Sequence, residues 1–151
     1  MIEFFVPGIP KTAGSKRAFV NPKTGRAIVT EDCRRSKDWQ AVVAHEAAEE
    51  YSGPLLHGPL WVRMHFWLPR PKAHYHTGKR SGLLRDVAPE WHAKRPDALK
   101  MARAVEDALT GVLWVDDAQI ADERLTKHYG ERPGVVVRVQ QLEDKPKEDQ
   151  P

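Results

Sequence analysis

The chain has 151 residues, a length that fits one domain with a hydrophobic core, and it carries 24 Lys and Arg against 21 Asp and Glu. Twelve prolines and ten glycines argue against a helical bundle, and the single cysteine, Cys33, excludes an intrachain disulfide and a cysteine zinc cluster. No apolar run approaches the roughly 20 residues of a membrane span, and the N-terminus lacks the pattern of a signal peptide. We therefore expect a protein of the reducing cytoplasm.

The first third of the chain predicts a strand, a hairpin and a helix. Residues 2–6, "IEFFV", are aromatic and β-branched and stop at Pro7-Gly8, as a strand does. The apolar triplets "AFV" and "AIV" flank the turn "NPKTG", which indicates a small hairpin. Thr30 is suited to cap a helix that starts at Glu31 and runs to about Tyr51. On its buried side we expect Trp39, Val42, Val43 and Ala47.

The rest of the chain predicts three more strands and a second helix. Residues 59–69 alternate with bulk on both faces, which favours a strand in the middle of a sheet, whereas residues 70–95 form a long basic loop without periodicity. Pro96 suits the first position of a helix over 96–109, and residues 122–129 and 134–142 predict two closing strands. Residues 1–142 are thus expected to form one α/β (α+β) domain, a mixed sheet with two main helices, before a disordered tail over 143–151.

Positive charge is gathered in two segments. No acid lies between Phe4 and Thr30, and the segment from Arg70 to Arg103 contains nine Lys or Arg but only three acids. Such clustering creates a local field for a polyanion, although ordinary solubilising charge is the alternative. For phosphate contacts the candidates are Lys11, Lys16, Arg17, Lys79, Arg80, Lys94, Arg95 and Lys100.

Aromatic residues and histidines accompany the basic loop. His74, His76 and His92 have no zinc-binding spacing, so we interpret them as loop histidines near the expected polyanion, with DNA as the candidate. Tyr75 and Trp91 are candidates to stack on unpaired bases, with simple packing as the alternative for Trp91. We assign Trp61, Trp67 and Trp114 to the core or to a dimer interface.

The acids of the second helix and of the segment after it have two interpretations. On a helical wheel the apolar face is opposite Asp97 and Asp107, which stand roughly 15 Å apart and so cannot share one ion. Asp107 follows Arg103 at ion-pair spacing, which favours a structural role. Asp97, at the helix entrance, and the adjacent Asp116 and Asp117, after the apolar "VLW", are either ordinary surface acids or ligands of a hard cation such as Mg²⁺.

One segment carries a resemblance to a known family. "RPD" at 95–97, "DALTG" at 107–111, Trp114 and "DDAQI" at 116–120 stand in the order and near the spacing of the RusA signature, K-P-D-x-D-N-L followed by D-A-L and D-D-x-Q. The N-terminal "FFVPGIPKTAGSKR" and the later "KDWQAVV" fit the same pattern. The chain therefore resembles the RusA family of Holliday junction resolvases, often carried by phages and prophages of bacteria.

The resemblance implies an activity, a cofactor and partners. RusA-like enzymes are small homodimers that bind four-way DNA junctions and cut two strands symmetrically, with Mg²⁺ or Mn²⁺ held by aspartates. Asp97 matches the first aspartate of the D-x-D pair, Asp117 the essential second aspartate of the D-D pair, and Arg103 a family lysine near the site. The resemblance also implies the cytoplasm of a bacterial host and gives Asp107 no catalytic role.

One position departs from the family pattern. Leu99 stands where the second aspartate of D-x-D is expected, and Lys100 replaces the asparagine that follows it. Leucine cannot bind a cation, so the site loses one carboxylate. Three outcomes remain open: Asp116 or another acid completes the ligand shell, one ion is held by two aspartates and extra waters, or the protein binds junctions and cuts them weakly.

Overall fold

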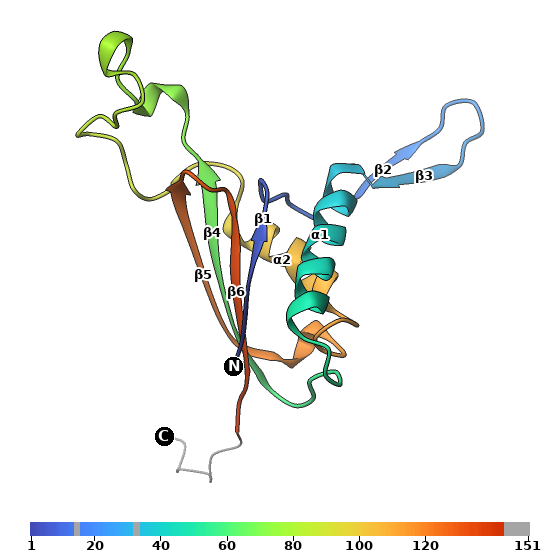
Figure 1. Cartoon of the computed structure of the whole chain (residues 1–151). Helices are drawn as coiled ribbons and strands as arrows, with labels where there is room; N and C mark the ends of the chain where they lie inside the picture. The colour runs from blue at the N-terminus through green and yellow to red at the C-terminus, as the bar shows by residue number, and fades with distance from the viewer. Residues whose placement is uncertain (14–15, 32–33, 144–151) are drawn as a thin grey trace, which may run out of the picture.

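The computed structural model describes residues 1–13, 16–31 and 34–143, without the side chains of residues 16–19, 28–31, 34 and 35. Four strands form one mixed sheet in the order β1-β6-β4-β5, and β2 and β3 form a separate two-stranded hairpin. Two helices, α1 and α2, lie together on one side of the sheet (Figure 1). The predicted fold class, a mixed sheet with two main helices in a single domain, is confirmed.

Strand β4 (Leu60–Pro69) lies inside the sheet, as its two bulky faces predict. On one side it pairs in parallel with β5 (Ile120–Gly130), and on the other it pairs antiparallel with β6 (Gly134–Gln141). Strand β1 (Ile2–Pro7) completes the sheet against the outer side of β6. Because β4 and β5 are parallel, the chain must cross over between them, and α2 belongs to that crossover.

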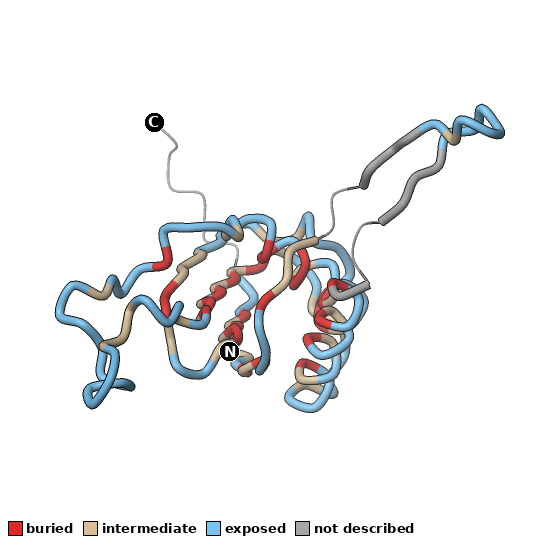
Figure 2. The backbone as a smooth tube through the Cα atoms, turned by 90° about the horizontal axis from the view of Figure 1, so that it is seen from above, coloured by how far each residue is buried: buried red, intermediate tan, exposed pale blue. Residues whose placement is uncertain are grey.

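The hydrophobic core fills the space between the sheet and the helices. Every second side chain of β4, from Leu60 to Leu68, is at most 3% exposed, and the interleaved ones are half-buried. Figure 2 shows the buried residues gathered along the sheet and on the facing sides of the helices. The helices contribute Trp39, Val43, Ala47, Met101, Ala102, Ala104, Val105 and Leu109. Full burial of a large apolar side chain contributes about 1.5–3 kcal/mol, so this layer dominates the stability of the fold.

Two glycines let the chain pass from β5 to β6 over the end of β4. A Cβ at Gly130 would lie 2.8 Å from the Trp67 ring, and one at Gly134 would lie 2.4 Å from the carbonyl oxygen of Val6. Neither position has room for a side chain, so the short connection between the strands is tight. It fixes the end of the sheet at which the long loop begins.

The helix α1 (Arg34–Glu50) begins later than the predicted start at Glu31. Thr30 and Glu31 instead belong to strand β3 (Ala27–Glu31), where they pair with Arg17 and Lys16 of β2 (Lys16–Val20). The β-branched Thr30 fits this extended backbone, so pairing across the hairpin prevails over the capping signal. Val42 was predicted to be buried and is 37% exposed.

The helix α2 (Ala98–Leu109) also begins later than predicted, because Pro96 precedes it and Asp97 is the N-cap. Its buried side includes Ala104 in addition to Met101, Ala102, Val105 and Leu109, while Ala98 and Ala108 are half-buried. Cys33 and residues 144–151 of the tail lie outside the described residues. Within the described ranges, no helix has the length and apolar character to span a membrane.

Candidate functional site

Asp97 stands exposed where the long loop enters α2. Its carbonyl oxygen accepts the hydrogen bond of the Met101 N–H, but its carboxylate makes no capping bond. The Lys100 ammonium lies 3.8 Å from this carboxylate, and both side chains are 62% exposed. An exposed carboxylate at a helix N-terminus is stabilised by the helix dipole and remains available to a ligand.

A shallow cavity of about 420 Å³ surrounds this aspartate. It is lined by Thr12, Arg95, Pro96, Asp97 and Lys100. The Ala13 N–H donates to the Lys100 carbonyl oxygen, which holds the N-terminal segment against the start of α2. The cavity therefore combines one carboxylate with two cations, a composition that suits a phosphate diester beside a metal ligand.

The returning end of the long loop is hydrogen-bonded to the outer edge of β5. Lys127 Nζ donates to the carbonyl oxygens of Lys94 and Pro96 at 2.7 and 2.8 Å. The His92 N–H donates to the Lys127 carbonyl oxygen, and the Tyr129 N–H donates to that of Glu90. These bonds place Lys94 and Arg95 directly before Asp97. Lys127 was not among the predicted residues, because a lysine in a strand carries no signal of such a role.

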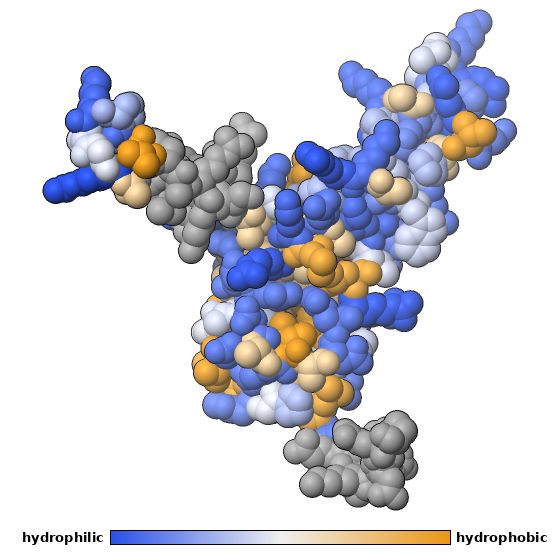
Figure 3. Space-filling view, turned by 180° about the vertical axis from the view of Figure 1, so that it is seen from behind, coloured by the Kyte–Doolittle hydropathy of each residue, from blue (hydrophilic) through white to orange (hydrophobic). Residues whose placement is uncertain are grey.

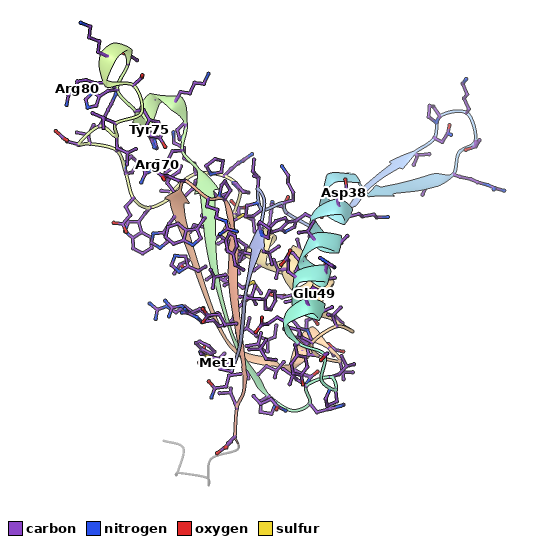
Figure 4. The ribbon with its side chains drawn as sticks, viewed as in Figure 1. Met1, Asp38, Glu49, Arg70, Tyr75 and Arg80 are labelled. Carbon is purple, nitrogen blue, oxygen red and sulfur yellow. The ribbon has the colours of Figure 1, made fainter. Side chains whose placement is uncertain are left out.

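The long loop over 70–95 is held by backbone hydrogen bonds and carries cationic side chains at its tip. The backbone pairs His76 with Leu83 and Arg85 with His74, and the turn between them carries Lys79 and Arg80. Figure 4 shows Arg80 near the far end of the loop and Arg70 close to the sheet, with Tyr75 between them. Arg70 closes the base of the loop by donating to the Pro89 carbonyl oxygen. Two of the predicted phosphate contacts thus lie far from the body of the protein.

Two of the three loop histidines pack against an aromatic ring. His74 and His92 pack against the ring of Tyr129, with centroids 4.8 and 4.6 Å away. His92 is 9% exposed, and its burial, with the neighbouring charge of Lys127, lowers its pKa below the ordinary value. His92 therefore belongs to the packed base of the loop, where it supports the backbone.

Two arms rise from the same end of the molecule. The long loop and the hairpin β2–β3 project from the end at which β4 finishes, and α2 begins between them (Figures 1 and 2). Lys23 and Arg26 lie exposed at the hairpin tip, while the side chains of Lys16 and Arg17 lie outside the described residues. Figure 3 shows a largely hydrophilic surface on the loop. Asp97 thus sits between two cationic projections.

The "DDAQ" segment forms a capped turn at the opposite end of α2. Asp116 Oδ1 accepts from the Ala118 N–H, and Gln119 Oε1 accepts from the N–H groups of Val115 and Asp116. Gln119 Nε2 donates to the carbonyl oxygens of Leu56 and Gly58. Asp116 is thus the capping residue of this turn. Asp117 is exposed and does not cap it. The D-x-x-Q spacing is a capping-box signal that sequence reasoning left unused.

Three further acids gather beside Asp117. Burial, a hydrogen bond between the protonated Glu106 carboxyl and the Glu123 side chain, and the negative charges of Glu123, Asp117 and Asp107 raise the pKa of Glu106 to about 8. Sequence reasoning missed Glu106 and Glu123, since one lies on a helix and the other on a strand with no spacing between them to read. Burial is the first cause of this raised pKa, and the negative charges of the neighbouring acids add to it.

One chain does not bring Asp97 and Asp117 together. Lys127 Nζ reaches the backbone next to Asp97, whereas Asp117 precedes Ile120 at the start of β5. Lys127 comes seven residues after Ile120 along β5, which corresponds to roughly 23 Å of strand between the Asp97 end and the Asp117 end. Within the ranges that the structure describes, no three His, Cys, Asp or Glu side chains form a group that could hold a metal ion. Arg103 lies exposed on α2 between the two ends.

The sequence matches known proteins over most of its length. Residues 7–140 match the model of the family described as "Endodeoxyribonuclease RusA", so the chain belongs to the RusA endodeoxyribonuclease family. It is also similar to a Bacillus subtilis (strain 168) protein described as "Uncharacterized protein YqaN". The two are 27% identical over 146 residues, which cover 93% of this chain and 96% of the relative. Membership supports an endonuclease of the kind that resolves Holliday junctions.

Proposed function

We propose that the protein is a divalent-metal-dependent endonuclease that binds four-way DNA junctions and resolves them by two symmetric cuts in the bacterial cytoplasm. The observation that carries this proposal is the exposed Asp97 in a cationic cavity between two basic arms, in a chain of the RusA family. The arms hold phosphates without reading bases, so they select the shape of the DNA. We assign these contacts to Lys11, Lys16, Arg17, Lys79, Arg80, Lys94, Arg95 and Lys100.

The residues at the two ends of α2 suit Mg²⁺ or Mn²⁺, because carboxylates are the side chains that hard cations prefer. When bound, such an ion polarises the phosphoryl oxygen and activates a water molecule. We propose Asp97 and Asp117 as its ligands, with Asp116 contributing the oxygen that does not cap the turn. Arg103 and Lys94 would stabilise the negative charge that develops at phosphorus.

Because Asp97 and Asp117 lie at opposite ends of α2, a shared ion requires two copies of the chain. We propose a homodimer in which Asp97 of one copy meets Asp117 of the other, at two sites related by a twofold axis. Two equivalent sites also match two symmetric cuts. Light scattering then gives twice the mass of the 17.2 kDa chain, and a monomeric mass together with cutting contradicts this arrangement.

A second candidate is a protein that binds junctions but cuts them weakly. Leu99 favours it, because this side chain is 72% exposed beside Asp97, at the position where the family has an aspartate. The Lys100 ammonium lies 3.8 Å from the Asp97 carboxylate and competes with a metal ion for it. A carboxylate at position 99 would restore one ligand, so Leu99→Asp is expected to increase cutting if the site is active and suboptimal.

The test is cleavage of a labelled four-way junction with Mg²⁺ or EDTA, on denaturing and native gels. Asp97→Asn and Asp117→Asn are each expected to abolish cutting and to retain the shifted band, since both remove negative charge. Asp86→Asn is the matched control, because it removes an exposed acid of the long loop and is expected to cut like the parent. If Asp97→Asn or Asp117→Asn cuts the junction at the rate of the parent, the assignment of these aspartates as metal ligands is wrong.

Mixing the two inactive variants tests whether the sites are shared. In a mixed dimer of Asp97→Asn with Asp117→Asn, one shared site keeps both aspartates and the other loses both. We expect the mixture to regain single-strand nicks, although neither variant cuts alone. A mixture that stays inactive after subunit exchange has been verified places each site within one chain. A parent that shifts the junction without nicks in any divalent metal supports the binding protein.

A further inference from the structure

Within residues 1–13, 16–31 and 34–143, no helix lies over one face of the sheet. Both helices pack on the other face, and side chains project from the sheet on the side away from α1 (Figures 1 and 4). The alternation of each strand assigns residues to this open face. It comprises Glu3 and Phe5 of β1, Trp61, Arg63, His65 and Trp67 of β4, Asp122, Arg124, Thr126 and His128 of β5, and Val136, Arg138 and Gln140 of β6.

Three arginines stand side by side across the open face. Arg63 of β4 is in register with Arg124 of β5 and with Arg138 of β6, and Arg138 is in register with Glu3 of β1. Neighbouring strands lie about 4.8 Å apart, and like charges directly opposite one another are destabilising. Glu3 forms an ion pair with Arg138. This row of four therefore keeps two positive charges in excess.

An aromatic stack adjoins the arginine row. Trp67 stacks on His65 at 4.8 Å, His65 on His128 at 4.5 Å, and Trp91 lies 4.1 Å from His128. Trp91 ends this stack and is 59% exposed, while Trp61 lies half-exposed on the opposite side of the row. Flat rings thus lie on both sides of the guanidinium groups, which is the composition of surfaces that bind single-stranded nucleic acid.

The open face also holds polar atoms that have no partner. Among the described residues, Arg63 Nε, His65 Nε2 and Thr126 Oγ1 are buried and make no hydrogen bond, and the buried His128 Nδ1 lies 3.8 Å from Glu90 Oε1 without a hydrogen bond. Buried polar atoms in folded proteins are nearly always paired, so a ligand would satisfy these atoms only after the side chains above them move. Burial and the positive charges of His128, Arg63 and Arg138 lower the pKa of His65, in agreement with a positive field over this face.

Charge decides between the two occupants that such a face could take. A second copy docked face to face about an axis near Arg63 would oppose two arginine rows, with Glu3 as the acid at one end of each row and Asp122 in the row beside it. A nucleic acid strand supplies phosphates to the row and bases to the rings, as on other four-stranded sheets that bind bases through aromatic residues. Only unpaired bases expose their faces for stacking, so the strand must be single.

We propose that the open face of the sheet binds single-stranded DNA through Arg63, Arg124 and Arg138, with Trp61 and Trp91 as stacking platforms. This surface is separate from the cavity at Asp97, which lies on the side of α2. It goes beyond the proposed cutting of four-way junctions, because it adds affinity for branched DNA that carries unpaired segments. Binding at this face needs no divalent metal.

The test is fluorescence anisotropy of a labelled dT20 oligonucleotide in EDTA at 50 mM salt, with a duplex of the same length as competitor. The double variant Arg63→Gln/Arg124→Gln is expected to bind dT20 about tenfold more weakly. Its slope of log K against log salt is expected to fall by about 1.4, since each lost phosphate contact removes about 0.7 for single strands. Arg124→Gln alone, at a fully exposed position, gives half of this change if the double variant folds poorly.

Two further variants separate stacking from charge and from the arms. Trp91→Leu is expected to weaken dT20 binding about tenfold and to leave the salt slope unchanged. Lys79→Gln/Arg80→Gln, at the tip of the long loop, serves as the matched control and is expected to bind dT20 like the parent. The nuclease proposal is tested separately by metal-dependent cutting of the four-way junction, so failure of this inference leaves that proposal standing.

Two outcomes overturn the inference. One is parental dT20 affinity and salt slope in the folded double variant, which leaves the arginine row without a role in DNA binding. The other is light scattering in which the parent is a dimer and Arg63→Gln/Arg124→Gln or Trp67→Ala is a folded monomer. The second result assigns the open face to a second copy of the chain.

Discussion

Strand β4 presents Val62, Met64 and Phe66 to the helices and Arg63, His65 and Trp67 to the opposite side of the sheet. The first set is fully buried and purely apolar, whereas the second is half-buried and contains polar atoms without partners. Ten consecutive residues thus build both a core and a candidate binding surface. The comparison teaches that apolar burial on the covered face stabilises the sheet. That stability offsets the repulsion among the arginines on the open face.

The largest expected effect is on the covered face. Phe66→Ala is expected to destabilise the protein by about 3–5 kcal/mol, because it leaves a cavity between the sheet and the helices. The neighbouring change Trp67→Ala, on the open face, is expected to cost about 1–2 kcal/mol. Urea denaturation followed by circular dichroism measures both. If both variants lose the same free energy of unfolding, the two faces of β4 contribute equally to stability, which contradicts the comparison.

The next effect concerns the carboxyl pair at the margin of the covered face. The pKa of Glu106 is raised to about 8, so between about pH 4.5 and 8 the folded protein retains a proton that the unfolded chain releases. Stability therefore falls as pH rises through this window, by on the order of 1 kcal/mol after screening of the half-exposed pair. Glu106→Gln is expected to flatten this dependence in urea denaturation at pH 5 and pH 8.

The control for that change is Glu49→Gln, which removes an exposed glutamate of α1 (Figure 4). Its pH dependence is expected to follow the parent. If Glu106→Gln keeps the full decline between pH 5 and pH 8, the carboxyl pair is not its source.

A smaller effect of opposite sign is expected from the open face. The pKa of His65 is lowered, first by burial and then by the charges of His128, Arg63 and Arg138. The unfolded chain therefore takes up a proton near pH 6.5 before the folded protein does, and stability falls as pH drops below that value. His65→Gln is expected to weaken this acid-side decline in thermal melts at pH 7 and pH 5. An unchanged decline assigns it to other groups.

The smallest expected effect isolates charge on the open face from its packing. Glu3 pairs with Arg138 on the surface, and this pairing lowers the pKa of Glu3. Glu3→Gln is expected to leave the urea midpoint unchanged, because exposed ion pairs contribute little to stability. It is expected to tighten dT20 binding about twofold at 50 mM salt, since it frees a third arginine for phosphate. Weaker binding would mean that Glu3 orients Arg138 for its ligand.

The sequence predicted several parts of the fold and site because their signals are local. Alternation in residues 59–69 identified a central strand with two bulky faces, and the order of motifs identified the family. The start of α1 was misplaced because the capping signal of Thr30 is local, whereas its strand pairing with Arg17 is not. The roles of Asp116 and Gln119 as a cap were readable from spacing and were not read.

Other features depend on contacts between distant segments. Glu106 and Glu123 share a hydrogen bond between a helix and a strand, and Lys127 holds the loop 31–33 residues earlier in the chain. The arginine row exists because three strands adopt one register, and a shift of one residue would turn those side chains to the covered face. No spacing in the sequence reveals that alignment.

By itself, the sequence determined which residues alternate, where the second helix lies, and which family signature the chain carries. These properties follow from side-chain chemistry and from the periods of helix and strand, which neighbouring residues impose on one another. The tertiary structure alone decided that one chain does not bring Asp117 back to Asp97 and that three arginines stand together on an open sheet. Distances between remote side chains depend on strand order and register, and those are settled only when the whole core packs.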